Sequence, residues 1–324
     1  MLRWGLLGTS RIGRSVIPAL RESGLATVAA VGSRSAARGG AYAAEYGIPR
    51  AYDGYERLLA DDDIDVVYNA LPNHLHAEWT VRALRAGRHV LCEKPLAITL
   101  DEVDAIAAAA RETGRVATEA FMYRHHPLTS EVESIVRSGR IGALRAIRGA
   151  FTFVLAREGD VRFDAALGGG SLWDVGCYPV SYACLLTRQM PVDVFGWQRP
   201  GPMGIDLAFA GQLRFGDGVV AQFDSGFDTT FRSFMEIAGD DGLLRVDRAF
   251  KAGPASRLTF VHDDRETEWP FEAESPYLGE IRDITAAIAD RRPPRVTLDE
   301  SRGIVAVLLA LYESARMGAP RQLR

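Results

Sequence analysis

The residues best suited to chemistry are a lysine and a tyrosine that lie far apart in the sequence. Lys94 stands in Glu93-Lys94-Pro95, just after an apolar segment, and Tyr178 follows Asp174 by four residues. A phenol has a pKa of about 10, which is too high for an efficient base near neutral pH. A nearby lysine ammonium would lower that pKa, and Asp174 could orient the substrate or the lysine. The set predicts a proton relay for alcohol oxidation.

Each of these residues also has a structural interpretation. Lys94 could form a salt bridge, and an aspartate and a tyrosine four residues apart share one face of a helix, where such pairs often serve packing. The run Gly168-Gly169-Gly170 precedes them. Because glycines allow the backbone to approach a ligand closely, this run favours the functional interpretation.

The N-terminal segment carries a phosphate-binding turn. Gly8, Ser10 and Gly13 occupy the small-residue positions of a G-x-G-x-x-G loop, with serine in the middle. The loop follows an apolar strand and precedes a helix, so a tight turn and backbone amides at a helix start are retained. A glycine-rich turn without a ligand is the alternative. The predicted cofactor contacts here are Gly8, Thr9, Ser10, Arg11, Ile12 and Gly13.

The end of the second predicted strand indicates which dinucleotide is bound. A carboxylate there would bind a ribose 2′-hydroxyl, but this chain has Ser33 and Arg34, with Arg38 one turn later. A guanidinium offers a charged fork for phosphate oxygens and can stack on adenine. These three residues predict NADP(H) rather than NAD(H), although Arg34 could instead be a solvated surface charge.

Further cofactor contacts are expected where later strands end, because the carboxyl ends of strands line the ligand crevice of a doubly wound sheet. Two such segments begin at Leu71 and Glu93. His76 could contact the ribose or the nicotinamide, or could cap a helix. The residues predicted to line this part of the crevice are Leu71, Pro72, Asn73, His76, Glu93, Lys94 and Pro95.

Substrate contacts are expected from two other segments. One is the run 119–127, where the first domain gives way to the second, and the other is 160–173. Arg162 could reach the substrate or form a surface salt bridge. An adjacent histidine pair without a third ligand does not make a metal site, so none is predicted. The candidate substrate residues are Tyr123, Arg124, His125, Arg162 and Trp173.

The elements that must position these residues alternate in the first part of the chain. Apolar segments predict strands at 3–8, 26–32, 64–70, 89–92 and 115–119, separated by helices at 11–23, 35–46, 76–86 and 99–114. Thr99 and Glu102 match a capping box at the last of these helices. Alternating strands and helices with short connections are typical of a parallel, doubly wound Rossmann sheet. The fold class is therefore α/β, with a dinucleotide-binding domain at 1–123.

The periodicity changes after residue 123. Strands are predicted at 144–155, 207–215, 219–227 and 234–238, with helices at 127–138, 171–187, 277–290 and 298–316. Gly216-Asp217-Gly218 predicts a hairpin turn. Residues 124–324 should therefore form an α+β domain that binds substrate and oligomerises through a mostly antiparallel, open sheet.

The composition restricts the class of partner. Among 324 residues the net charge is −4 without a long block of one sign, which argues against nucleic acid or anionic membrane as the main partner. No apolar run approaches the length of a membrane helix, and the N-terminus enters a strand at once, so no export signal is expected. Three cysteines, an odd number without metal-ligand spacing, favour the reducing cytoplasm.

The motifs, taken in order, make the chain resemble the Gfo/Idh/MocA oxidoreductases nearly end to end. The similarity lies in the segments 8–10, 72–74, 93–95, 119–127 and 168–179. Many members have histidine where this chain has Tyr178. The tyrosine and Gly32-Ser33-Arg34 are more similar to the branch that contains glucose–fructose oxidoreductase, NADP-dependent xylose dehydrogenase and dimeric dihydrodiol dehydrogenase.

This resemblance implies catalytic roles for Lys94, Asp174 and Tyr178, and a cis peptide bond before Pro95. It also implies a homodimer or homotetramer formed through the sheet of the second domain. The predicted function is an NADP(H)-dependent oxidoreductase that transfers hydride to or from a hydroxyl-bearing carbon of a sugar, polyol or cyclic diol. Two alternatives remain at this point: a regulatory protein that senses dinucleotide and sugar without turnover, and a nicotinamide-assisted glycosidase.

Overall fold

The computed structural model describes residues 1–157 and 159–323, which form two compact units. The first unit contains Met1–His125 and Tyr277–Arg302, and the second contains His126–Pro276 and the residues from Gly303 onward. Residues 277–302, assigned by the sequence analysis to the second domain, therefore belong by their contacts to the first unit. Each unit is described by itself below.

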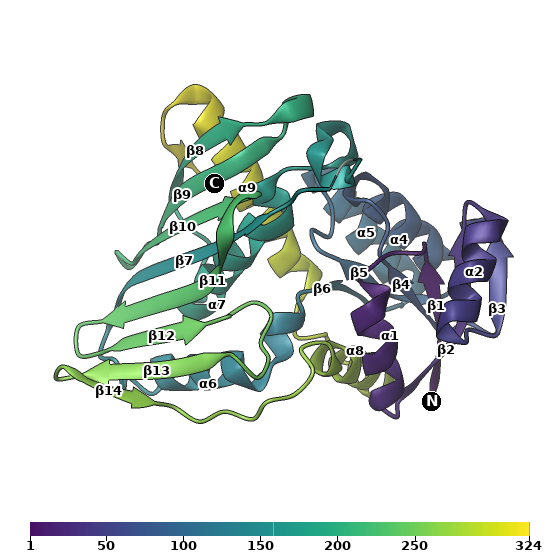
Figure 1. Ribbon diagram of the computed structural model, residues 1–324, viewed down its shortest axis with the longest axis horizontal. Coiled ribbons are helices and arrows are strands. Elements are labelled where there is room, and N and C mark those ends of the chain that lie inside the picture. Colours follow the sequence, from purple (N-terminus) through teal and green to yellow (C-terminus); the bar gives the residue numbers. More distant parts are fainter. Residues whose placement is uncertain (158, 324) are drawn as a thin grey trace. The chain divides into compact units, whose positions relative to one another are not determined.

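The first unit is built on a parallel sheet of six strands within the described residues (Figure 1). The strands are β1 (Leu2–Leu7), β2 (Ala26–Ser33), β3 (Arg50–Asp53), β4 (Val66–Asn69), β5 (His89–Glu93) and β6 (Ala117–Ala120). Their spatial order is β3-β2-β1-β4-β5-β6, and each neighbouring pair is parallel. This is the strand order of a Rossmann sheet, in which the direction of winding reverses between β1 and β4.

The helices of this unit alternate with the strands, as the sequence predicts. They are α1 (Gly13–Glu22), α2 (Ala36–Tyr46), α3 (Tyr55–Leu59), η1 (Asn73–Leu75), α4 (His76–Arg85), α5 (Leu100–Thr113), η2 (Met122–His125) and α8 (Leu278–Asp290). The predicted capping box of α5 is confirmed, because Thr99 accepts a bond from the Glu102 backbone and the Glu102 side chain accepts one from the Thr99 backbone.

One part of the strand prediction for this unit is wrong. The segment 64–70 contains the fourth strand rather than the third, because β3 and α3 precede it. β3 is a short edge strand with half-exposed and exposed residues in alternation. Such a strand lacks the continuous apolar run that identifies β4, whose residues are all buried.

The second unit is built on a nine-stranded sheet in the described part of the chain (Figure 1). The strand order is β14-β13-β12-β11-β7-β10-β9-β8-β15, and the pairs are antiparallel except for β7 and β10, which run parallel. The strands are β7 (Leu144–Val154), β8 (Asp193–Pro200), β9 (Asp206–Arg214), β10 (Val220–Gly226), β11 (Asp228–Gly239), β12 (Leu243–Asp247), β13 (Arg257–His262), β14 (Arg265–Glu268) and β15 (Arg321–Gln322).

The helices of the second unit are α6 (Pro127–Arg137), α7 (Cys177–Thr187), the part of α9 (Leu298–Met317) that begins at Gly303, and the short turns η3 (Val161–Phe163), η4 (Ala165–Leu167), η5 (Leu172–Gly176) and η6 (Pro202–Gly204). The predicted helix at 171–187 consists of a π-helical turn, η5, followed by α7. The predicted hairpin at Gly216-Asp217-Gly218 joins β9 to β10. Across the described residues, no helix combines the length and apolar character that a bilayer-crossing segment requires.

Candidate active site

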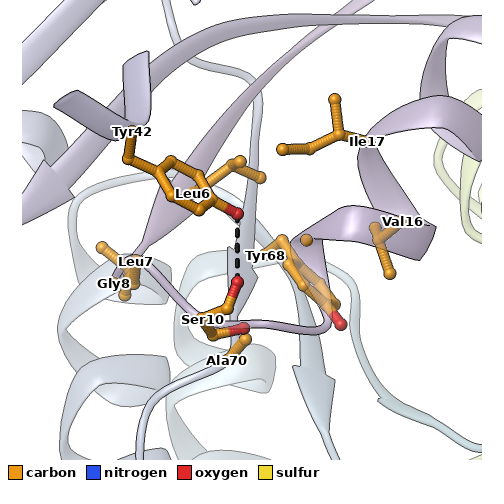
Figure 2. A pocket seen from close by; sticks show the side chains of 10 residues that line it. Leu6, Leu7, Gly8, Ser10, Val16, Ile17, Tyr42, Tyr68 and Ala70 are labelled. Carbon is orange, nitrogen blue, oxygen red and sulfur yellow. Dashed lines mark hydrogen bonds between the residues drawn. The ribbon is translucent and has the colours of Figure 1, made fainter. Parts of the chain in front are cut away.

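The glycine loop of the first unit is shaped by close contacts that only glycine permits. Gly8 has a φ of +85°, and a Cβ atom there would lie 3.0 Å from Leu71 Cδ2. A Cβ atom on Gly13 would lie 1.7 Å from the hydroxyl oxygen of Tyr42. That hydroxyl donates a hydrogen bond of 3.1 Å to the Ser10 carbonyl, so α2 braces the loop directly (Figure 2). No sequence motif marks Tyr42, so its role was not predicted.

A small hollow borders this loop at the point where the direction of winding reverses (Figure 2). Ligands of open α/β sheets bind at such a point. Tyr68 lines the hollow from β4 and donates a hydrogen bond to Glu93 at the end of β5. The residues that line the hollow are Leu6, Leu7, Gly8, Ser10, Gly13, Val16, Ile17, Tyr42, Tyr68 and Ala70.

The structure brings the predicted 2′-phosphate residues to the carboxyl end of β2. Arg38 donates a hydrogen bond of 3.3 Å to Thr9 Oγ1 of the glycine loop. The Ser33 hydroxyl accepts one of 3.2 Å from the Ser35 backbone. Arg34 and Arg38 are both exposed. Arg38 therefore lies beside the predicted phosphate loop, and Arg34 at the end of β2 interacts with the Tyr55 hydroxyl.

The loop that carries Lys94 is held by buried polar side chains on both sides. Glu119 Oε1, from β6, accepts a hydrogen bond of 2.8 Å from the Leu96 backbone. His76 Nδ1, at the start of α4, lies 2.7 Å from the Pro95 carbonyl oxygen. The peptide bond between Lys94 and Pro95 is cis, as the family resemblance implies. Because proline has no N–H group, the Leu96 amide is the first backbone donor after Lys94 that can anchor the loop.

His76 bridges two loops at the carboxyl edge of the sheet. Its Nε2 atom lies 2.7 Å from the Leu71 carbonyl oxygen, and its Nδ1 atom contacts Pro95. Burial lowers the pKa of His76 to about 4, so the ring is neutral at pH 7. A neutral imidazole donates from only one nitrogen, and the ring therefore donates to one of the two carbonyls at a time.

A buried acidic group lies beside Glu93 and was not predicted. Glu280, on α8, is 1% exposed. Burial, followed by the charge of Glu93, raises the pKa of Glu280 well above its ordinary value. Tyr277, which precedes α8, interacts with both carboxyl groups and with Ser15. These groups escaped the sequence analysis because they are separated from Glu93 by most of the second unit in the chain.

In the second unit, three predicted residues lie together. Arg162 Nε is 2.8 Å from Asp174 Oδ2, and Arg162 also pairs with Asp160 at 3.3 Å. The Asp174 carboxylate is the main cause that raises the pKa of the Arg162 guanidinium, to which Tyr178 also contributes. Tyr178 is 3% exposed, and its ring packs against Phe151 at 5.4 Å between centroids. Arg162, Asp174 and Tyr178 thus form one electrostatic cluster.

Two glycines of the run before Asp174 approach other parts of the protein closely. A Cβ atom on Gly169 would lie 2.5 Å from the Arg162 carbonyl oxygen, and one on Gly170 would lie 2.2 Å from Asp206 Oδ1. Contacts within the protein therefore account for these glycines. A close approach of this backbone to a ligand stays a prediction.

The remaining substrate candidates are buried within their own units. Tyr123 is 1% exposed, and Arg124 forms an ion pair with Glu300. His125 Nδ1 lies 4.0 Å from Asp283, and burial lowers its pKa to about 3. Trp173 packs against the ring of Tyr312 at 5.7 Å. Contacts of these four residues with a substrate stay a prediction.

Known protein families match both parts of this chain. Residues 2–121 match an oxidoreductase family with an NAD-binding Rossmann fold, and residues 129–245 match the GFO/IDH/MocA C-terminal domain. The chain belongs to the Gfo/Idh/MocA oxidoreductase family. The predicted fold, an N-terminal Rossmann sheet followed by a mostly antiparallel sheet, is confirmed.

Members of the family are similar to this chain over nearly its whole length. D-xylose 1-dehydrogenase (NADP(+)) 2 of Haloferax volcanii is 40% identical over 99% of this chain and 100% of its own. A dTDP-3,4-didehydro-2,6-dideoxy-alpha-D-glucose 3-reductase of Actinomadura kijaniata is 33% identical over 97% of this chain and 96% of its own.

Solved structures of the family also match. Aldose-aldose oxidoreductase from Caulobacter crescentus, complexed with glycerol, has a TM-score of 0.93 and 27% identity over 99% of both chains. KijD10, a 3-ketoreductase from Actinomadura kijaniata, in complex with NADP and TDP-benzene, has a TM-score of 0.91 and 32% identity over 97% of both chains.

The contact between Gly13 and Tyr42 yields a first prediction. Gly13→Ala should lower the free energy of unfolding by about 1–3 kcal/mol, because the added methyl group would overlap the Tyr42 hydroxyl. In a Tyr42→Phe background the loss should be smaller, and a double-mutant cycle in denaturant measures the difference. Gly40→Ala, also in α2, is the control and should not destabilise, because nothing lies within 4 Å of the place that its methyl group would occupy. Equal losses in both backgrounds would contradict the proposed contact.

The buried His76 yields a second prediction, on pH. Its folded-state pKa of about 4 lies below the ordinary value of 6.5, so the unfolded chain takes up a proton first as the pH falls. Stability that is present above pH 6.5 should therefore be lost between about pH 6.5 and pH 4, on the order of 3 kcal/mol for this residue. Denaturant unfolding of His76→Asn across that range should show a shallower decline than the unmodified protein.

His262 provides the control for this measurement. It is half-buried, and the Asp241 carbonyl, followed by the charge of Asp263, raises its pKa. A raised pKa contributes stability at low pH, so His262→Asn should not make the decline shallower. Identical slopes for His76→Asn and the unmodified protein would show that His76 does not titrate as its burial requires.

Proposed function

We propose that this chain is an NADP(H)-dependent oxidoreductase that transfers hydride to or from a hydroxyl-bearing carbon of a sugar, polyol or cyclic diol. The observation that carries the proposal is the full-length similarity to an NADP(+)-dependent xylose dehydrogenase, at 40% identity over 99% of this chain. The sugar-nucleotide 3-reductase and the aldose-aldose oxidoreductase support the same class of substrate. Membership of an oxidoreductase family favours catalysis over a purely sensing role.

The residues of the first unit fit the cofactor. Gly8 and Gly13 let the loop pack closely against Leu71 and Tyr42, which a Cβ atom would prevent, and backbone amides at the start of α1 suit a pyrophosphate. The exposed Arg34 and Arg38, together with Ser33, suit a 2′-phosphate. Leu71, Pro72, Asn73 and Glu93 at the ends of β4 and β5 would hold the nicotinamide ribose. When bound, NADP(H) supplies or accepts the hydride.

The chain's own residues supply the proton chemistry in this proposal. Tyr178 acts as the general acid or base at the substrate hydroxyl, and Lys94 is its proposed electrostatic partner. Asp174, through its ion pair with Arg162, is fixed in position to orient the substrate. His76 would support this chemistry through the loop that carries Lys94.

We also propose a homodimer or homotetramer that assembles through the sheet of the second unit. Its strands and turns expose large apolar side chains, with exposed fractions of 71% for Trp197 on β8, 63% for Val154 on β7 and 50% for Phe231 on β11. The cytoplasm is the proposed compartment, because Cys92, Cys177 and Cys184 form no disulfide in the described chain.

The function is tested by following absorbance of the reduced nicotinamide with aldoses, inositols and cyclic diols, each with NADP⁺ and with NAD⁺. With the best substrate, Lys94→Ala and Tyr178→Phe should each lower kcat by about two orders of magnitude, while NADPH binding is largely retained. Lys251→Ala and Tyr182→Phe are the controls, since Lys251 is exposed and Tyr182 lies one turn further along α7. Full turnover by both active-site variants would refute the mechanism. Glycoside cleavage without net NADPH formation would indicate the redox-neutral alternative.

The cofactor assignment is tested separately by fluorescence titration of NADPH and NADH. Replacing Arg34 and Arg38 together by alanine should weaken NADPH binding at least tenfold and leave NADH binding within about twofold, because only the 2′-phosphate would lose charged hydrogen bonds. Arg85→Ala removes an exposed guanidinium from α4 and should change neither affinity. An equal loss for both cofactors would argue against recognition of a 2′-phosphate.

A further inference from the structure

A buried carboxylate holds the beginning of the helical segment that carries Asp174 and Tyr178. Asp206, the first residue of β9, is 2% exposed. Its Oδ2 atom accepts hydrogen bonds of 2.7 Å from the Ser171 hydroxyl and of 2.7 Å from the Leu172 backbone. Its Oδ1 atom accepts one of 2.6 Å from the Tyr312 hydroxyl of α9. Every residue in this network belongs to the second unit.

The network is suited to fixing a helix start. Leu172 is the first residue of the π-helical turn η5, so its backbone N–H would otherwise lack an intrahelical acceptor. Burial raises the pKa of Asp206, and the donors around it oppose that shift by stabilising the carboxylate. Ser225 on β10 adds a hydroxyl 3.0 Å from that of Ser171. The helix start is therefore tied to β9, β10 and α9 together.

The backbone at Gly170 lies so close to the Asp206 carboxylate that only glycine fits there. Gly170 has a φ of +121°, and a Cβ atom there would lie 2.2 Å from Asp206 Oδ1 and 3.0 Å from the Tyr312 hydroxyl. The Asp174 backbone N–H donates to the Gly170 carbonyl at 3.1 Å. Asp206 thus contacts the residues directly before Asp174, and the Gly170 carbonyl carries that contact into the turn.

The turn itself is sensitive to its starting point. Asp174 lies in a π-helical turn and Tyr178 in the first turn of α7, so the angle between their side chains depends on where the wider turn begins and ends. Trp173 fills the space beside this turn and packs against Tyr312, the residue that also donates to Asp206. A loss of the Asp206 contacts would therefore release both the backbone and the neighbouring aromatic ring.

We propose that Asp206 is a positioning residue, which sets the orientation of Asp174 and Tyr178 by anchoring the first turn of η5. This inference rests on the proposed function, since it assigns Asp206 to the same reaction. It also explains a feature of the sequence that the reaction alone does not, namely the requirement for glycine at 170.

The experiment compares Asp206→Ala and Asp206→Asn with the unmodified enzyme. Asp206→Ala should lower kcat by about a hundredfold, since small displacements of catalytic groups have effects of that size. It should leave the Kd of NADPH within about twofold, because the proposed NADPH site lies in the first unit. Asp206→Asn should restore kcat to within about tenfold, because its amide oxygen can still accept from Ser171 and Leu172 while Tyr312 reverses its hydroxyl. Asp240→Ala, at an exposed aspartate paired with Arg145, is the control and should leave kcat unchanged.

Two results would overturn the inference. One is an Asp206→Ala enzyme whose folded fraction keeps full kcat, which would give Asp206 a role in stability alone. The other is unchanged backbone hydrogen exchange of segment 171–178 in Asp206→Ala. If Asp206 anchors this segment, its backbone should exchange faster in the variant than in the unmodified protein. Because exchange requires no substrate, it separates a failure of this inference from a failure of the proposed function.

Discussion

Parallel pairing places the carboxyl ends of neighbouring strands at one edge of the first sheet, and the cofactor site depends on that constraint. The loop at Gly8, the guanidinium groups after β2 and the segments after β4 and β5 come from distant parts of the sequence. The hydrogen bonds of the parallel ladders hold them in register. Each loop then needs only local contacts to complete it, such as the bond from Tyr42 to the Ser10 carbonyl.

Both units use the same physical means to fix a functional segment. A buried side chain from another strand accepts a backbone N–H group next to the proposed catalytic residue: Glu119 does so for Leu96, and Asp206 does so for Leu172. A buried carboxylate is costly unless it is bonded, so each acceptor strongly favours the one local conformation that supplies its donors. Rigidity at these segments therefore comes from the core behind them.

Local patterns in the sequence predicted the fold class and the main elements of both units, and the roles of the site residues stay predictions. Continuous apolar runs identified β4 and β5, and the capping box at Thr99 identified the start of α5, because these signals involve neighbouring residues. The strands β3, β8, β12, β13, β14 and β15 were missed. Two of them, β3 and β14, are edge strands whose residues are largely exposed and therefore form no apolar run. Asp206 and Glu280 were missed because their partners are remote in sequence. The contacts of Gly169 and Gly170 with Arg162 and Asp206 were not predicted, since only the structure shows which parts of the chain their backbone approaches.

The composition of the first unit from two chain segments bears on biosynthesis. Contacts of α8 with α1 and with η2 complete this unit, yet α8 begins at Leu278, after most of the second unit has been translated. The Rossmann sheet therefore emerges from the ribosome well before the helix that covers part of it. During that interval the surface that α8 will cover, including the neighbourhood of Glu93, is open to solvent, so this unit completes its packing only after α8 has been synthesised.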